Sequence, residues 1–347
     1  MCLRHDGGNA ADVFQPDDYF TDSAASAANL QRDAGDKGRL LRLPGEVSET
    51  MMSAAQPHPD DGLEAAYAAP HNACDTHFHI FGPADKYPHV TTDLRYRPPH
   101  APLAEYLGTT HRLGLTRFVF VQPSAYGLDN ACMLDAMAEV DPAMRRGIVH
   151  LDETNAKDAD LAGWHERGVR GVRINISPIR KPEAGLADAL RPKIVRTADI
   201  CRSLGWHVDL LLPGWLIGEL MPTLRELPVG FSVAHMGLFP AAGGASQPGF
   251  QDLLALAADG SRRCWVKLTG IYRFSESPTF ADVKPLAQAL IATAPDQLIW
   301  GSDFPHLSFH DKVGTIGLYN TLADWAPDAA TRRRILADNP ARLFGFS

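Results

Sequence analysis

Residues 74–83, which read CDTHFHIFGP, decide both the fold and the kind of site that this chain can carry. His77 and His79 stand two positions apart in this run, and on an extended strand residues i and i+2 project from the same face. Both imidazoles can therefore converge on one ion or one substrate. Taken alone, such a pair can equally decorate a loop, so its meaning depends on the rest of the chain.

Two later segments have a related design. Residues 232–237 read SVAHMG and residues 299–306 read IWGSDFPH, so each is an apolar run that ends in an ionisable residue followed by turn-forming residues. The ionisable residues are His235 and Asp303. Three apolar strands that deliver polar groups at their C-terminal ends are typical of a barrel active site.

From residue 72 onward, short β-rich apolar runs alternate with longer segments of helical period, as in repeated βα units around a parallel sheet. The predicted strands are residues 73–81, 117–122, 147–151, 169–176, 206–212, 231–235, 264–268 and 298–301. The predicted helices are residues 103–113, 130–140, 158–167, 187–204, 215–227, 249–258, 282–294 and 331–337. We therefore predict an α/β fold, a single closed (β/α)8 TIM-like barrel. An open nucleotide-binding sheet is the structural alternative, but no G-x-G-x-x-G follows the first strand.

The first 70 residues differ from the rest of the chain. They show no sustained period, are rich in Ala, Asp, Ser, Gly and Pro, and hold twelve acidic against five basic residues. They therefore carry most of the formal net charge of −8. We predict a poorly ordered N-terminal extension, residues 1–70, in front of the barrel, residues 71–347.

Composition excludes several classes of protein. A hydrophobic content of 45% with 21% charged residues is ordinary for a globular chain, and the nearly neutral barrel portion argues against a nucleic-acid partner. No apolar run reaches the roughly 20 residues of a membrane span, and no secretory signal is recognisable, so we expect no membrane partner and a cytoplasmic location. The five scattered cysteines are expected to be reduced core thiols.

One mechanism that this site could use is activation of water by a bound divalent metal ion. His77, His79 and Asp303, helped by His235, form a ligand set that suits zinc or manganese, and such an ion lowers the pKa of bound water toward about 7. Asp303 would take the proton from the attacking water and return it to the leaving group. A binuclear site also needs ligands from the fourth and fifth strands, but these read VRGVRINI and VDLL. One ion and no ion both remain open.

Two arginines predict an anionic substrate. Arg173 lies on the fourth predicted strand and Arg273 follows the seventh, and a guanidinium supplies paired donors that match a carboxylate. Asn175, two residues beyond Arg173 on the same face, would complete the clamp. Pairing of Arg173 with an internal carboxylate is the alternative.

Other residues at the same rim are predicted to contact the substrate. Ser124 and Tyr126 follow the second predicted strand, where they could hydrogen-bond a ligand hydroxyl, although this segment also reads as a turn and helix cap. His306 is predicted to line the pocket.

Taken in order, the motifs of the chain resemble the amidohydrolase superfamily, specifically the amidohydrolase 2 group of 2-pyrone-4,6-dicarboxylate lactonase, related sugar-acid lactonases and lactone isomerases. The motifs are residues 74–83, residues 121–130 (VQPSAYGLDN), residues 171–175 (GVRIN), residues 235–237 (HMG), residues 300–306 (WGSDFPH) and residues 339–344 (NPARLF). The resemblance runs from about residue 72 to the C-terminus.

The resemblance implies a barrel that hydrolyses a lactone, with Asp303 as general base, the three histidines around the reacting carbonyl, and Arg173 and Arg273 as carboxylate contacts. Members of the group differ in metal use, and the pyrone lactonase works without an ion. Here the HMG motif continues into Leu238 where the pyrone lactonase has an arginine, and Leu211 replaces a strand tyrosine. With fewer polar side chains than the pyrone lactonase to hold carboxylates, this chain is expected to act on a substrate with fewer carboxylates, such as a muconolactone-like or aldaric-acid lactone.

We therefore predict a hydrolase that opens a small carboxylated lactone by water attack. The alternatives are a metal-dependent decarboxylase of a carboxylated ring, a lactone isomerase in which Asp303 or His235 shuttles a proton, and a non-catalytic binding barrel. The expected partner is the small molecule, and assembly into a homo-oligomer is left open.

Overall fold

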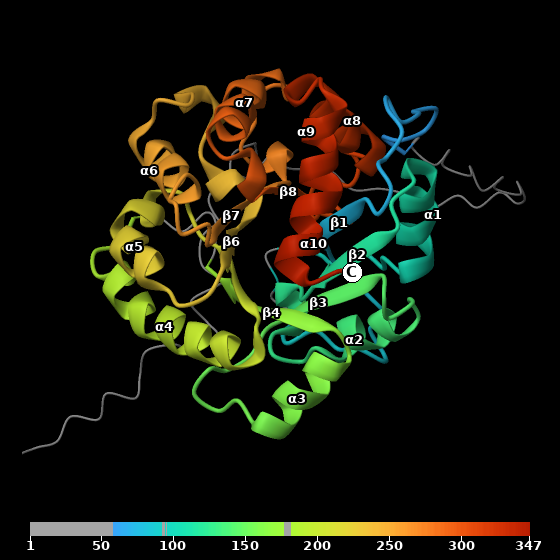
Figure 1. Ribbon diagram of the computed structural model, residues 1–347. Helices are drawn as coiled ribbons and strands as arrows, with labels where there is room; N and C mark the ends of the chain where they lie inside the picture. Colours follow the sequence, from blue (N-terminus) through green and yellow to red (C-terminus); the bar gives the residue numbers. More distant parts are fainter. Residues whose placement is uncertain (1–57, 92–93, 95, 177–181) are drawn as a thin grey trace, which may run out of the picture. The chain divides into compact units, whose positions relative to one another are not determined.

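The computed structural model describes residues 58–91, 94, 96–176 and 182–347 (Figure 1). Within them, eight parallel strands form one sheet whose spatial order follows the sequence. The strands are β1 (Cys74–Phe78), β2 (Arg117–Val121), β3 (Arg145–Val149), β4 (Val169–Asn175), β5 (His207–Leu211), β6 (Phe231–Val233), β7 (Cys264–Leu268) and β8 (Leu298–Trp300). Helices surround the strands in Figure 1. The predicted (β/α)8 TIM-like barrel is confirmed.

The seam between β8 and β1 is closed by the residues that carry the predicted site. The backbone N–H of Asp303 donates to the carbonyl of His77, and the N–H of His79 donates to the carbonyl of Phe304, both at 2.8 Å. Gly301 permits this approach, because a Cβ there would lie 2.7 Å from the Cβ of His77. The same hydrogen bonds therefore join the first and last strands and fix the backbone of both site segments.

The α-helices are α1 (Leu103–Leu113), α2 (Ala131–Ala138), α3 (Asp158–Glu166), α4 (Leu186–Leu204), α5 (Trp215–Glu226), α6 (Pro248–Ala257), α7 (Lys284–Thr293), α8 (Thr315–Trp325), α9 (Ala329–Arg333) and α10 (Asn339–Phe344). Each helix except α9 buries at least one apolar residue, and α9 has no buried residue. In α1 the buried residues Leu103, Tyr106, Thr110 and Leu113 recur at spacings of three and four. Gly114 ends this helix with a left-handed φ of 76°.

The structure differs from the predicted elements around the last strands. β6 and β8 end before His235 and Asp303, because these residues have φ values of 52° and 59° that a strand does not allow. The segment after β8 forms α8, which the sequence did not predict. The predicted helix at residues 331–337 falls instead within α9 and a π-helical turn, Arg334–Asp338, that leads into α10.

The C-terminal segment closes the mouth formed by the N-terminal ends of the strands. Arg117 and Arg146, near the starts of β2 and β3, lie over the ring of Phe346, 5.0 and 4.4 Å from its centroid. Arg146 also donates to the carbonyls of Phe344 (3.0 Å) and Gly345 (2.7 Å). Figure 1 marks the C-terminus over the strands. The predicted site residues lie at the opposite mouth, where the strands end.

The described chain begins before the predicted start of the barrel. The carboxylate of Asp60 accepts hydrogen bonds from the backbone N–H groups of Ile316 (3.0 Å) and Gly317 (3.2 Å) in the first turn of α8. Tyr67 stacks on Tyr319 with ring centroids 4.5 Å apart. Residues 58–70 thus pack on the barrel, although the sequence assigned them to the extension. Residues 1–57 of the predicted extension lie outside the described residues.

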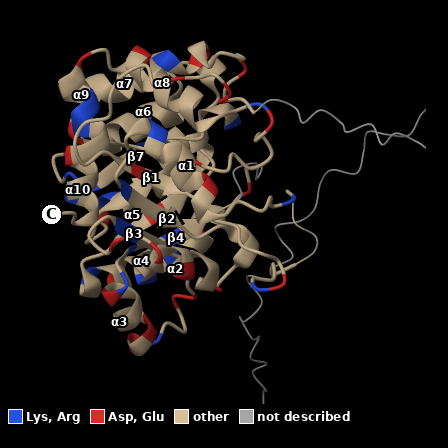
Figure 2. Cartoon of the chain, turned by 90° about the vertical axis from the view of Figure 1, so that its right-hand side faces the viewer, with Lys and Arg blue, Asp and Glu red and all other residues tan. Residues whose placement is uncertain are grey.

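Charge, hydropathy and cysteine state in the structure bear on the expectations from composition. Figure 2 shows Lys and Arg mixed with Asp and Glu over the helices of the face that it presents. None of the helices in the described part is long and apolar enough to cross a membrane. The described cysteines are buried free thiols, as predicted: Cys74, Cys132, Cys201 and Cys264.

Candidate active site

His77 and His79 lie together at the C-terminal end of β1. Both are buried, and their ring centroids are 5.1 Å apart with an interplanar angle of 82°. His79 Nδ1 lies 2.8 Å from the carbonyl oxygen of Val121, at the end of β2. Because a carbonyl oxygen can only accept, Nδ1 carries the proton of neutral His79. This leaves Nε2 of His79 as an acceptor.

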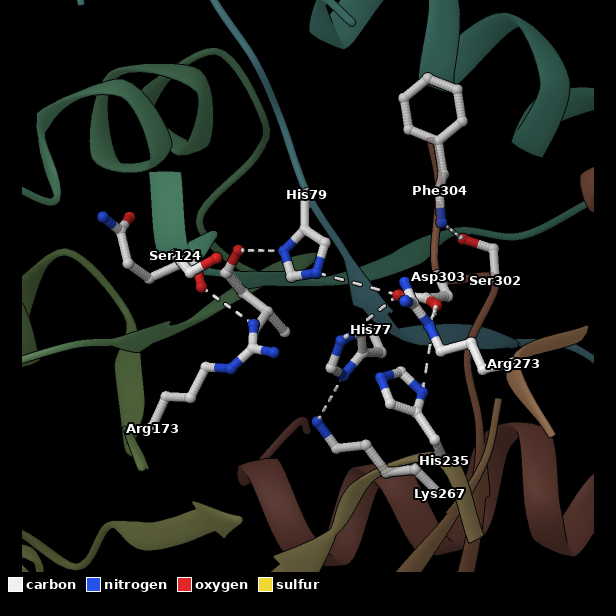
Figure 3. A network of polar contacts seen from close by, with 12 residues as sticks. His77, His79, Ser124, Arg173, His235, Lys267, Arg273, Ser302, Asp303 and Phe304 are labelled. Carbon is white, nitrogen blue, oxygen red and sulfur yellow. Dashed lines mark hydrogen bonds and ion pairs between the residues drawn. The ribbon is translucent and has the colours of Figure 1, made fainter. Parts of the chain in front are cut away.

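Asp303 is the centre of the site (Figure 3). Its Oδ1 lies 3.7 Å from His77 Nε2 and 3.8 Å from His79 Nε2, and it has no hydrogen-bond partner among the described residues. Its Oδ2 accepts from the Tyr272 hydroxyl (2.6 Å) and from Arg273 Nε (2.9 Å). Burial alone would raise the pKa of Asp303, but Arg273 and the neighbouring histidines hold it well below its usual range. One carboxylate oxygen is therefore held, and the other can act as a base.

A tight turn after β6 brings in the third imidazole. His235 and Met236 have left-handed φ values of 52°, a conformation that costs about 1–2 kcal/mol for each non-glycine residue. His235 Nδ1 lies 4.0 Å from Asp303 Oδ2, and its ring centroid is 5.0 Å from that of His77. A Cβ on Gly270 would lie 2.4 Å from His235 Nδ1. Glycine at this position therefore allows the ring to approach.

A layer of buried polar groups lies behind His77. Lys267 Nζ, from β7, lies 2.7 Å from Asp209 Oδ1, on β5. The hydroxyl of Ser232 donates to the same oxygen (2.6 Å). Lys267 Nζ also lies 3.1 Å from His77 Nδ1 and 3.4 Å from the carbonyl oxygen of Thr76. Burial would raise the pKa of Asp209, but its cationic neighbours, Lys267 first, hold it below the usual range.

Asp75 organises the backbone of the two site segments. Its Oδ1 accepts the N–H groups of His77 and Ser302, both at 3.0 Å, and its Oδ2 accepts the Tyr106 hydroxyl at 3.0 Å. Burial raises the pKa of Asp75 to about 6, against the effect of these hydrogen bonds. This carboxylate ties the end of β1 to the residue before Asp303.

Arg173 enters the site from β4. It is buried, its Nη1 donates to the carbonyl of Gln122 (2.9 Å), and its Nε has no partner among the described residues. Burial lowers the pKa of Arg173, while Asp209 and Asp303 oppose that shift. Asn175 ends the same strand two positions further on. This placement is compatible with a substrate carboxylate and also with internal pairing to Asp209.

Ser124 and Tyr126 have other partners in the short helical turn after β2. Ser124 is exposed, and its hydroxyl lies 3.0 Å from the hydroxyl of Tyr96. Tyr126 is buried, and its hydroxyl accepts the backbone N–H of Gly82 (3.2 Å). Tyr126 therefore packs under the loop after β1, while Ser124 faces solvent beside Tyr96.

His306 is buried next to the segment that carries Asp303. Its backbone N–H donates to the carbonyl of Asp303 (2.8 Å), and its Nε2 lies 3.3 Å from the hydroxyl of Thr315. Its ring centroid is 5.9 Å from that of Tyr272, which itself contacts the Asp303 carboxylate. His306 therefore supports the wall of the site behind Tyr272.

The distances at His77, His79 and Asp303 would admit a metal ion, since their ligand atoms lie within 4.8 Å of one another. His79 Nε2 and Asp303 Oδ1 each offer a lone pair. His77 is the ligand in question, because Lys267 Nζ lies 3.1 Å from its Nδ1, and an ammonium there would make Nδ1 an acceptor and leave the ring proton on Nε2, the atom that would have to bind the ion. Two ligands would then remain where catalytic zinc normally has three. With the ring proton of His77 on Nε2, the three residues would not form a complete set of zinc ligands.

The sequence did not single out several residues that complete the site. Tyr272 donates to the base, Asp209 and Asp75 anchor the buried layers, and Tyr96 lies at the rim. Burial raises the pKa of Tyr96, and the nearby Arg173 is among the groups that partly offset this shift. For Asp75 and Asp209, the sequence did offer a signal: each is the single acidic residue of an apolar strand, CDTHF and HVDLL.

The buried histidines predict that the protein is sensitive to acid. Burial lowers the pKa to about 3 for His79 and His235, and to about 4 for His150, His207 and His306. The unfolded chain therefore binds more protons than the folded one below pH 6.5, so stability is lost as the pH falls from 6.5 toward 4. We expect urea denaturation to give a free energy of unfolding that falls by several kcal/mol across this window. A flat profile would contradict the neutral buried histidines.

The fold and the site define a class of protein. Residues 74–346 match the amidohydrolase family, and the chain belongs to it. Over 286 residues it is 38% identical to the 4-sulfomuconolactone hydrolase of Hydrogenophaga intermedia, covering 80% of this chain and 90% of the relative. It is 29% identical over 289 residues to the 2-pyrone-4,6-dicarboxylate hydrolase of Comamonas testosteroni, and the match covers 80% of this chain and 92% of that relative.

A solved structure has the same barrel. The putative 2-pyrone-4,6-dicarboxylic acid hydrolase from Pseudomonas putida is 34% identical, with a TM-score of 0.69, over 80% of this chain and 98% of that chain. The resemblance to the amidohydrolase 2 group that the motifs indicated is thus confirmed.

Proposed function

We propose that this chain is a lactone hydrolase that opens the ring of a small anionic lactone. The observation that carries the proposal is the state of Asp303: a fully buried carboxylate with Oδ2 held by Tyr272 and Arg273 and with Oδ1 free between two imidazoles. An ionised carboxylate in that setting can take a proton from water. The relatives named as lactone hydrolases support this reading.

The reaction follows from these positions. A water oxygen attacks the lactone carbonyl carbon while Asp303 Oδ1 takes one of its protons. The resulting tetrahedral anion is stabilised by N–H donors in the site, where water is excluded and hydrogen bonds are stronger. When the bond from this carbon to the ring oxygen breaks, Asp303 returns the proton to that oxygen. The product is an open-chain carboxylic acid with a hydroxyl or enol group, and the acid releases its proton to solvent to become a carboxylate.

The substrate carries a negative group that Arg173 and Arg273 recognise, with Asn175 beside Arg173. Arg273 is tied to Asp303 through Nε alone, so its terminal nitrogens can face a ligand. Leu211 and Leu238 stand where more polar clamps occur in the pyrone lactonase, which favours a less highly carboxylated ring. A muconolactone-type lactone bearing a carboxylate or a sulfonate fits these features, and one relative is named for 4-sulfomuconolactone.

Metal-free hydrolysis is the version of this function that the site supports. The competing decarboxylase requires a bound ion. His77 would be a poor ligand for that ion in the arrangement described above, because its ring proton would lie on Nε2, the nitrogen that faces the site. Lactone isomerisation uses the same proton carrier but takes up no water, so its product would remain a lactone.

A lactone panel tests the proposal. Purified protein, treated with a chelator and dialysed, is expected to release protons from a muconolactone-type substrate at a rate close to that of untreated protein. Carbon dioxide release would indicate a decarboxylase, and a new lactone without proton release an isomerase. Failure to turn over any carboxylated or sulfonated lactone would overturn the proposed function.

A further inference from the structure

His77 in β1 and His79 just after it have opposite partners at Nδ1 (Figure 3). His79 Nδ1 faces the carbonyl of Val121 (2.8 Å), whereas His77 Nδ1 faces the side-chain nitrogen of Lys267 (3.1 Å). A neutral imidazole has one N–H and one lone pair, and the partner at one nitrogen decides where the proton lies. The charge on Lys267 therefore decides the tautomer of His77.

The surroundings of Lys267 are those of an ammonium. Its Nζ contacts three acceptors, Asp209 Oδ1 at 2.7 Å, His77 Nδ1 at 3.1 Å and the Thr76 carbonyl oxygen at 3.4 Å, which match its three N–H groups. A neutral amine would leave the fully buried Asp209 carboxylate without this counter-charge, which is costly. Ser232 donates to the same carboxylate oxygen (2.6 Å). His77 Nδ1 is therefore an acceptor, and its ring proton lies on Nε2.

We propose that Lys267 is a positioning residue that fixes His77 as an N–H donor at Nε2, so that His77 and His79 hold opposite tautomers. His77 Nε2 lies 3.7 Å from Asp303 Oδ1 and has no partner among the described residues. A donor at this point can bond the lactone carbonyl oxygen as the attack of water gives it negative charge. His79 Nε2, an acceptor, can orient the water. The catalytic meaning of these tautomers rests on the proposed lactone hydrolysis, but the tautomers themselves do not.

The charge on Lys267 also strengthens His77 as a donor. A cation at one ring nitrogen polarises the imidazole, so the N–H at the other nitrogen becomes more acidic and bonds an oxyanion more strongly. The same contact prevents His77 from binding a metal ion through Nε2, because a protonated Nε2 has no lone pair to donate. Removal of the ammonium would free this lone pair and complete a set of three ligands with His79 and Asp303.

The tautomers can be measured directly. In long-range proton–nitrogen NMR spectra of protein labelled with 15N-histidine, wild-type His77 is expected to show an unprotonated Nδ1 and a protonated Nε2. His79 is expected to show the reverse pattern, and His77→Gln and His79→Gln assign the two sets of signals. A protonated Nδ1 in wild-type His77 would overturn the proposal, even if no Lys267 variant folds.

Lys267→Met removes the ammonium and keeps most of the side-chain volume. We expect the His77 pattern to be lost in this variant and kcat for lactone opening to fall about 100-fold, with a smaller change in KM, as for loss of one oxyanion donor. Zinc titration of metal-free protein should show tighter binding by Lys267→Met than by wild type. Equal or weaker binding by the variant would contradict the claim that Lys267 withholds His77.

Ser232→Ala is the matched control within the same buried layer. It removes the hydroxyl that supports Asp209 but keeps Lys267 beside His77, so the wild-type histidine pattern should remain. Loss of the pattern in this control would assign the effect to general disturbance of the layer and overturn the role of Lys267. The spectra and the zinc titration need no substrate. Failure of the lactone panel would thus overturn the proposed function and leave the tautomer result standing.

Discussion

Asp303→Asn is expected to lower kcat for lactone opening by about 1000-fold, within the range that general acid–base catalysis supplies. The amide has nearly the shape of the carboxylate but cannot take a proton from water. Its oxygen can still accept from Tyr272 or Arg273, so the site should keep its shape and KM should change less than kcat. Steady-state proton release at several substrate concentrations separates the two parameters.

A surface substitution of the same kind is the control for Asp303→Asn. Asp160, exposed in the first turn of α3, lies outside the site, and Asp160→Asn should turn over at a rate close to that of wild type. Near-parent turnover by Asp303→Asn, in protein with an unchanged thermal unfolding curve, would refute the assignment of Asp303 as the base. It would also reopen the interpretation of the barrel as a binding protein.

The second large effect is expected in stability. Asp209→Ala leaves the Lys267 ammonium buried without its carboxylate, and breaking one side of a buried ion pair costs about 3–5 kcal/mol. Urea denaturation should therefore show a large fall in the free energy of unfolding. The double substitution Lys267→Met with Asp209→Leu removes both charges and should recover much of this loss, because well-packed apolar residues can replace such a pair.

An exposed ion pair provides the comparison. Asp188 pairs with Arg191 on the surface of α4, where the aspartate side chain is 75% exposed. Asp188→Ala should cost about 1 kcal/mol or less, since solvent screens such pairs. If Asp209→Ala cost as little as Asp188→Ala, the buried layer would not contain the charged pair on which the tautomer of His77 depends.

The local pattern of the chain was enough to predict the barrel and the centre of its site. His77 and Asp303 each end an apolar run, and in a parallel barrel the ends of all strands meet at one mouth. Their contact follows from that rule without knowledge of any side-chain distance. The family resemblance then supplied the class of reaction.

Features that depend on contacts distant in sequence were not predictable in this way. α8 lacks a side-chain cap of its own, and its first turn is capped by Asp60 from the other end of the described chain. The pairing of Lys267 with Asp209 joins strands β7 and β5, so neither residue has a partner in its own run. The left-handed turn at His235 runs against the local preference of a non-glycine residue, which is why the sixth strand was predicted too long.

The backbone hydrogen bonds between β1 and the residues after β8 have a consequence for how this enzyme would lose activity on heating. Because His77, His79 and Asp303 are among the residues whose backbones bond across this seam, a local opening there separates the base from the imidazoles while the other strands are still paired. The rate of thermal inactivation would then be set by how often the seam between β1 and the segment after β8 opens, and activity would be lost before the whole chain unfolds.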